Sequence, residues 1–162
     1  MLFWQSVSTY PSSISIGDIA GRVGDISDYV NRHGYDAYAR ENVEAYCSLF
    51  RGGIRLDVLA LSSGFMTYAS DIHLEYGRIR REVEESARTF VLLPSLDREL
   101  CVAETVRRQV ARPFGRSPER EEAVIRARFE IYMSLPMRKV ETMRPVAAIV
   151  DEIVEVSTFD SL

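Results

Sequence analysis

Two short apolar runs, each followed by a turn-forming loop and then by a helical pattern, constrain the fold of this chain most strongly. Leu56–Leu61 precedes Ser62–Gly64, and Arg88–Leu93 is followed at once by Pro94. Buried strands of parallel sheets have this length and this continuous apolar character. Strands that alternate with helices indicate parallel βαβ units. The chain is therefore predicted to be an α/β protein, with a parallel sheet layered with helices.

Helix-start and helix-stop residues place the remaining elements. Gly34 is a suitable residue just after a helix, Ser117 with Pro118 is a typical helix start, and Ser95 is expected at the cap or first turn of another helix. The predicted helices are Asp25–His33, Tyr35–Phe50, Ser70–Glu85, Ser95 to about Val110, Ser117 to about Tyr132 and Pro145 to about Val156. Met1–Tyr10 and Arg138–Thr142 are read as further strands, Pro11–Ser15 as a loop and Ser157–Leu162 as a frayed tail.

Composition is ordinary for a globular protein of one domain, with 46% hydrophobic and 27% charged residues over 162 positions. No apolar run approaches the roughly 20 residues of a membrane span, and the N-terminus lacks the pattern of a signal peptide. A cytoplasmic protein without membrane contact is expected. Cys47 and Cys101 are isolated and are interpreted as inert thiols, and the lone His33 and His73 predict no metal site.

Arginine is concentrated in one part of an acidic chain. Residues 104–145 contain nine Arg, Lys139 and six acidic residues, a net charge of +4; the whole chain is −4, so the remainder is −8. Arginine suits carboxylates and phosphates, so this band predicts a site for a small anionic molecule. The alternative is a solvated surface in which the arginines pair with carboxylates on the same helices. Binding of the Arg112–Arg116 loop to an RNA or DNA backbone is a distant third interpretation, because the remainder of the chain is acidic.

Four stretches follow one another along residues 24–155: HGYDAYARENVEAYCSLF, then DVLALSSG, then RTFVLLPSLDRELCVAETVRRQVARPFGRSPEREEAVIRARFEIY, then KVETMRP. Their order and spacing resemble the shikimate kinase family of P-loop small-molecule kinases. The resemblance is more specific in the C-terminal half, where residues 106–120 correspond to the family's lid. It implies a P-loop kinase fold and phosphoryl transfer from ATP, with Mg²⁺, to a hydroxyl of a small carboxylate or carbohydrate-like acceptor.

The resemblance also implies roles for individual residues. Arg112 in RPF corresponds to the lid arginine that reaches the transferred phosphate, and Arg128 in RFEIY to an arginine that grips the acceptor's carboxylate. Arg144 corresponds to a position near the adenine, and Arg108 is a weaker candidate on the nucleotide side. Acceptor contacts are implied for Ser62, Ser63, Gly64 and Arg40.

The chain departs from the family in its nucleotide-binding motifs. Residues 1–24 are atypical, and the three glycines of Gly17–Gly24 do not form a Walker A loop. The only lysine is Lys139, and the family's Asp-x-Asp is absent. Either Met1–Tyr10 fills the slot of the missing strand, or the true start lies upstream, or the fold is rearranged. Two hypotheses stay open: an impaired kinase, or a non-catalytic relative that binds a small molecule or regulates. A homodimer is compatible with either.

Overall fold

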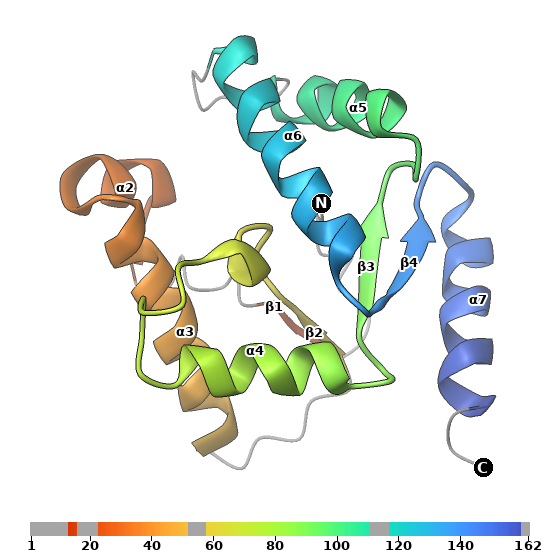
Figure 1. Cartoon of the computed structure of the whole chain (residues 1–162), viewed down its shortest axis with the longest axis horizontal. Helices are drawn as coiled ribbons and strands as arrows, with labels where there is room; N and C mark the ends of the chain where they lie inside the picture. The colour runs from red at the N-terminus through yellow and green to blue at the C-terminus, as the bar shows by residue number, and fades with distance from the viewer. Residues whose placement is uncertain (1–12, 16–22, 52–57, 111–116, 160–162) are drawn as a thin grey trace. The chain divides into compact units, whose positions relative to one another are not determined.

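The computed structural model of the chain describes residues 13–15, 23–51, 58–110 and 117–159 (Figure 1). The chain divides after Arg80 into two compact units, which are described separately below as the N-terminal unit and the C-terminal unit. Helix α4 (Tyr76–Glu85) spans the boundary between them. The single-domain interpretation of residues 1–162 stays a prediction.

The N-terminal unit begins with a helical hairpin. Helix α2 (Ile26–His33) starts at Asp25, whose side chain accepts a hydrogen bond from the Asp28 N–H, and ends at Gly34. Gly34 has a φ of 83°, a backbone conformation that glycine adopts without strain, so α3 (Tyr35–Arg51) can start immediately in a new direction. Both predicted helices are confirmed. On α3, Val43 and Cys47 are buried, whereas Phe50 is exposed.

A parallel strand pair follows the hairpin in the same unit. Strand β1 (Ser13–Ser15) pairs with β2 (Val58–Ala60), with Ile14 opposite Leu59. The strand expected within Leu56–Leu61 is confirmed for Val58–Ala60, but its expected burial is wrong, because Val58 is exposed and Leu59 and Ala60 are half-buried. The loop expected at Pro11–Ser15 is wrong for Ser13–Ser15, because pairing with a distant strand overrides the weak strand preference of serine. The strand expected at Met1–Tyr10 lies outside the described residues.

Aromatic side chains form the core of the N-terminal unit around the short 3-10 helix η2 (Phe65–Thr67). Phe65 lies within 6.0 Å, between ring centroids, of Tyr46, Tyr68 and Tyr76. The fully buried Tyr76 donates its hydroxyl to the Phe65 carbonyl at 2.6 Å. These contacts tie the first turn of α4 to η2.

Helix α4 starts later than predicted. It begins at Tyr76 rather than Ser70, because local hydrogen bonds hold the preceding residues in turns. The Ile72 N–H bonds the Ala69 carbonyl at 3.1 Å, and Nδ1 of His73 accepts from the Glu75 N–H at 3.1 Å.

The C-terminal unit is built on a second parallel strand pair. Strand β3 (Phe90–Leu93) pairs with β4 (Arg138–Glu141), so their carboxyl ends lie at the same edge (Figure 1). Val91, Leu93 and Val140 are buried. Both predicted strands are confirmed. The Thr142 N–H continues the contact by bonding the Leu93 carbonyl at 2.8 Å.

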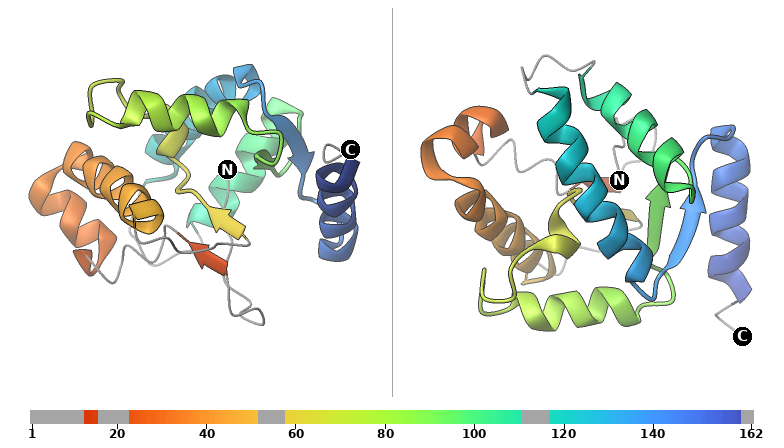
Figure 2. Two further views of the ribbon diagram at one scale, coloured as in Figure 1. Left: turned by 90° about the horizontal axis from the view of Figure 1, so that it is seen from below. Right: turned by 45° about the horizontal axis from the view of Figure 1, so that its top comes forward.

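Two helices connect these strands. Helix α5 (Arg98–Val110) leaves the end of β3, and α6 (Pro118–Ser134) leads to β4 (Figure 2). Ser117 caps α6 as predicted, by accepting from the Arg120 N–H at 3.3 Å. The cap expected of Ser95 is supplied by Asp97, whose carboxylate accepts from the Leu100 N–H at 2.9 Å. Residues 111–116, between the two helices, lie outside the described part.

Helix α7 (Val146–Phe159) runs beside β4 in both Figure 1 and Figure 2. Its start is confirmed, but it includes Ser157–Phe159, which were expected to fray. The apolar side chains of this helix differ in burial: Ile149 and Ile153 are half-buried, whereas Val146 and Val150 are 65% and 42% exposed.

The observed class is α/β, with mostly helical content and parallel strand pairs. Within the described residues each sheet contains two strands, β1–β2 and β3–β4. The fold class is confirmed at this level. A P-loop kinase fold stays a prediction.

Candidate functional site

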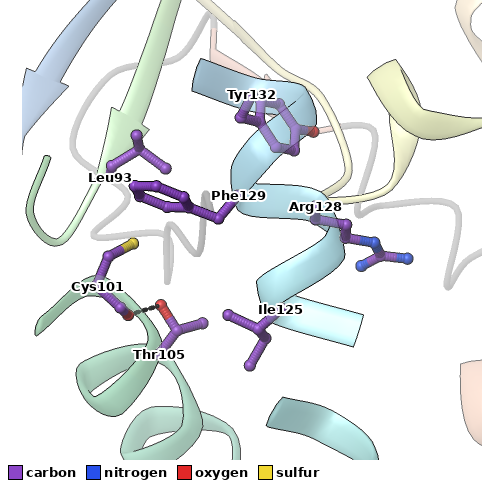
Figure 3. Close-up of a pocket in the computed structure, with 7 residues that line it drawn as sticks. All are labelled: Leu93, Cys101, Thr105, Ile125, Arg128, Phe129 and Tyr132. Atoms are coloured by element: carbon purple, nitrogen blue, oxygen red, sulfur yellow. Dashed lines mark hydrogen bonds between the residues drawn. The ribbon is translucent and has the colours of Figure 1, made fainter. Parts of the chain in front are cut away.

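The candidate site in the C-terminal unit lies where α6 packs against the end of β3 and against α5. Ser117 and Pro118 set the start of α6, and Ile125, Phe129 and Tyr132 then recur on its buried face. A small cavity of about 10 Å³ remains between the three elements, room for roughly one water-sized group. Its lining is Leu93, Cys101, Thr105, Ile125, Arg128, Phe129 and Tyr132 (Figure 3).

Arg128 borders this cavity through the apolar part of its side chain. Figure 3 shows its guanidinium pointing away from Leu93 and Phe129. The Thr105 hydroxyl, which also lines the cavity, donates to the Cys101 carbonyl at 2.7 Å. The cavity is therefore an apolar packing void, and the charged end of Arg128 points away from it.

One carboxylate of α5, Glu104, binds two arginines of the same helix. Glu104 accepts hydrogen bonds from Arg107 at 2.7 and 2.8 Å and from Arg108 at 2.6 Å. The bonds from Arg107 and then from Arg108 lower the pKa of Glu104 to about 2. Arg108, the weaker nucleotide candidate, is thus engaged by a residue one helical turn away, and a nucleotide contact for it stays a prediction.

A second group of ion pairs joins α5 to α6. Arg126 binds Glu99 with two hydrogen bonds of 2.8 and 2.7 Å and also reaches Glu122 on its own helix. Arg98 connects Glu99 to Glu130. The bonds from Arg126, and then from Arg98, lower the pKa of Glu99 to about 2. Sequence reasoning missed the contact between Glu99 and Arg126, since the partners are 27 residues apart.

The loops at the carboxyl ends of β3 and β4 are joined by one carboxylate. Oε1 of Glu141 accepts from the Leu96 N–H at 2.9 Å and from the Ser95 hydroxyl at 3.1 Å. Arg144, the adenine candidate, donates to the Glu141 carbonyl at 3.1 Å and pairs with Glu152 of α7. Arg144 therefore lies at this strand edge, but its guanidinium is engaged by the Glu141 carbonyl of β4 and the Glu152 carboxylate of α7.

The predicted acceptor residues belong to the N-terminal unit. Ser62 and Gly64 form the turn after β2, where the Ser62 hydroxyl shares a hydrogen bond of 2.9 Å with the Tyr68 hydroxyl. Gly64 is buried, and its carbonyl accepts from Thr67 at 2.8 Å. Ser63 is half-buried in the same turn. Arg40 is exposed on α3, whose buried face carries other residues. The turn is thus largely satisfied by its own unit.

His73 is held in one orientation by contacts on both ring nitrogens. Nδ1 accepts from the Glu75 N–H, and Nε2 lies 3.5 Å from Oε2 of Glu44, whose other oxygen, Oε1, binds Arg51 at 3.0 Å. Cys47, on the same helix as Glu44, is buried, and burial raises the pKa of its thiol. A raised pKa disfavours the reactive thiolate, so the inert interpretation of Cys47 has physical support.

Among residues 13–15, 23–51, 58–110 and 117–159, no group of three or more His, Cys, Asp or Glu side chains is arranged to hold a metal ion. No helix in this part of the chain is long and apolar enough to span a membrane. Arg112, the lid candidate, lies outside the described residues, so its implied role stays a prediction. The observations define an α/β protein with an arginine-rich helical pair.

Comparisons with family models, curated proteins and solved structures give no match for this chain.

Proposed function

We propose that the C-terminal unit binds a small molecule carrying a carboxylate or phosphate, with Arg128 as an anion-binding residue, in a chain related to the shikimate kinase family. The observation that carries the proposal is the arrangement β3–α5–α6–β4 with β3 and β4 parallel neighbours. The resemblance implies this order of elements around the acceptor-binding arginine. Open α/β sheets also bind their ligands beyond the carboxyl ends of the strands.

The position of Arg128 supports the anion-binding role. Arg128 is half-buried and lines the same small cavity as Leu93, the last residue of β3, and its guanidinium points away from Leu93 and Phe129 (Figure 3). A side chain whose stem is already ordered loses less conformational freedom when its head binds a ligand. The fork of a guanidinium suits a carboxylate or a phosphate in a bidentate contact.

Phosphoryl transfer is the first form of the proposal. In this form the chain uses ATP and Mg²⁺, and Arg112 supplies positive charge to the transferred phosphate in the way the resemblance implies. The chain's own arginines would then bind and orient the acceptor and the nucleotide, with Arg108 and Arg144 on the nucleotide side.

A non-catalytic binding or regulatory protein is the second form, and Lys139 favours it. Lys139 is the only lysine of the chain, and its ammonium donates to the Leu135 carbonyl at the turn between α6 and β4. This position is the amino end of β4, opposite the edge at which open α/β sheets bind phosphates. The sequence as given therefore offers no lysine for the charge compensation that ATP-dependent kinases use.

Calorimetric titration of the whole chain with ATP, ADP, shikimate and related carboxylates tests the proposal. Arg128→Ala should weaken binding of the carboxylate by roughly ten- to a hundredfold, since a charge-assisted hydrogen bond contributes about 1.5–3 kcal/mol. Arg128→Met keeps the apolar stem and should lose the same affinity without loosening the packing. Arg128→Lys should restore only part of it, because an ammonium cannot form the fork.

Arg138→Ala is the matched control. It removes the same charge from the exposed first residue of β4, at the opposite end of the strand pair, and should leave the affinity unchanged. Arg112→Ala should weaken nucleotide binding more than acceptor binding. If the wild type binds none of these ligands at about millimolar concentration, both forms of the proposal are contradicted. Binding of the carboxylate without release of ADP in the presence of Mg²⁺ would favour the second form.

A further inference from the structure

We draw no further inference here: the strongest candidate, the exposed apolar stripe that Val146, Val150 and Val154 form along α7 of the C-terminal unit, carries nothing because nothing in the structure shows what covers it.

Discussion

The side chain of Glu141 connects the end of β4 to the loop after β3. Its Oε1 binds the Leu96 N–H and the Ser95 hydroxyl beyond the end of β3. These bonds favour the ionised carboxylate, and the bond from Leu96, followed by that from Ser95, lowers the pKa of Glu141 from its usual range. A carboxyl group with a lowered pKa in the folded state stabilises the fold above its unfolded pKa, about 4.3 for Glu.

We expect Glu141→Gln to lower the midpoint of thermal unfolding at neutral pH. The reason is that an amide oxygen accepts hydrogen bonds less strongly than a carboxylate does. The difference from wild type should shrink as the pH falls from about 5 through the folded pKa of Glu141, because wild type then loses the same charge. Thermal unfolding followed by circular dichroism between about pH 3 and 7 measures this. A difference that stays constant over the whole range would show that the charge of Glu141 is irrelevant.

At the scale of elements, the start of α5 distinguishes the structure from the sequence-based expectation. Ser95 was the predicted cap, whereas the Asp97 carboxylate binds the Leu100 N–H. Asp97→Ala should therefore destabilise the fold by about 1 kcal/mol, the usual cost of losing such a cap. Asp97→Ser should retain most of the stability, because serine also caps helices. Urea unfolding of the three proteins provides the comparison; equal stability of wild type and Asp97→Ala would reject this cap.

The contact between α5 and α6 is the second element-scale test. Glu99 binds Arg126 and Arg98, which lower its pKa to about 2. Its contribution to stability is thus present above the unfolded pKa of about 4.3 and is lost as the pH falls toward 2. We expect Glu99→Gln to lower the unfolding midpoint at low salt, and less so at about 1 M salt, where exposed charges are screened.

Glu119→Gln is the matched control for Glu99. Glu119 also lies in the first turn of its helix and is exposed, but it has no ion pair with another described residue. Thermal unfolding at about 0.05 and 1 M salt should therefore show a larger and more salt-sensitive loss for Glu99→Gln than for Glu119→Gln. Equal losses would mean that the charge at a helix start matters and the arginine contacts do not.

Local signals were readable from the sequence because each acts within a few residues. Gly34 ends α2 and Ser117 starts α6 through hydrogen bonds to near neighbours, and the apolar runs became β2 and β3. Strand β1 was missed because its identity depends on pairing with residues about 45 positions away, which a serine-rich stretch does not signal. The sequence also did not show that Asp97 rather than Ser95 caps α5, because the Ser95 hydroxyl donates instead to Glu141 of the distant β4.

The candidate site was predictable in part for the same reason. Ile125, Phe129 and Tyr132 recur at helical spacing and are buried on α6, so this face could have been predicted from the sequence, although it was not. The pairing of Arg108 with Glu104 follows ordinary helix spacing and fits the salt-bridged-surface alternative. The ion pair between Arg126 and Glu99 could not be predicted from the sequence, because it depends on how α5 and α6 pack against each other.

At the scale of the whole molecule, the distribution of charge argues against a nucleic-acid partner. The net charge is +4 over residues 104–145 and −8 over the rest of the chain. Within the described part of the chain, Arg107 and Arg108 bind Glu104, and Arg126 binds Glu99 and Glu122. An arginine already paired with a carboxylate must lose that partner before it can neutralise a phosphate. The gain from releasing counterions of the nucleic acid is then reduced at these three arginines.

We therefore expect no saturable binding of a fluorescent oligonucleotide of about 20 nucleotides at about 0.15 M salt, and only weak binding near 0.05 M. Fluorescence anisotropy measures this directly. Glu104→Gln is the informative variant, because it weakens the hold on Arg107 and Arg108 and should increase binding at low salt. Glu119→Gln changes the net charge equally without releasing a described arginine and should have a smaller effect. Submicromolar binding by wild type at about 0.15 M salt, falling steeply as salt rises, would instead assign the arginine band to a nucleic-acid backbone.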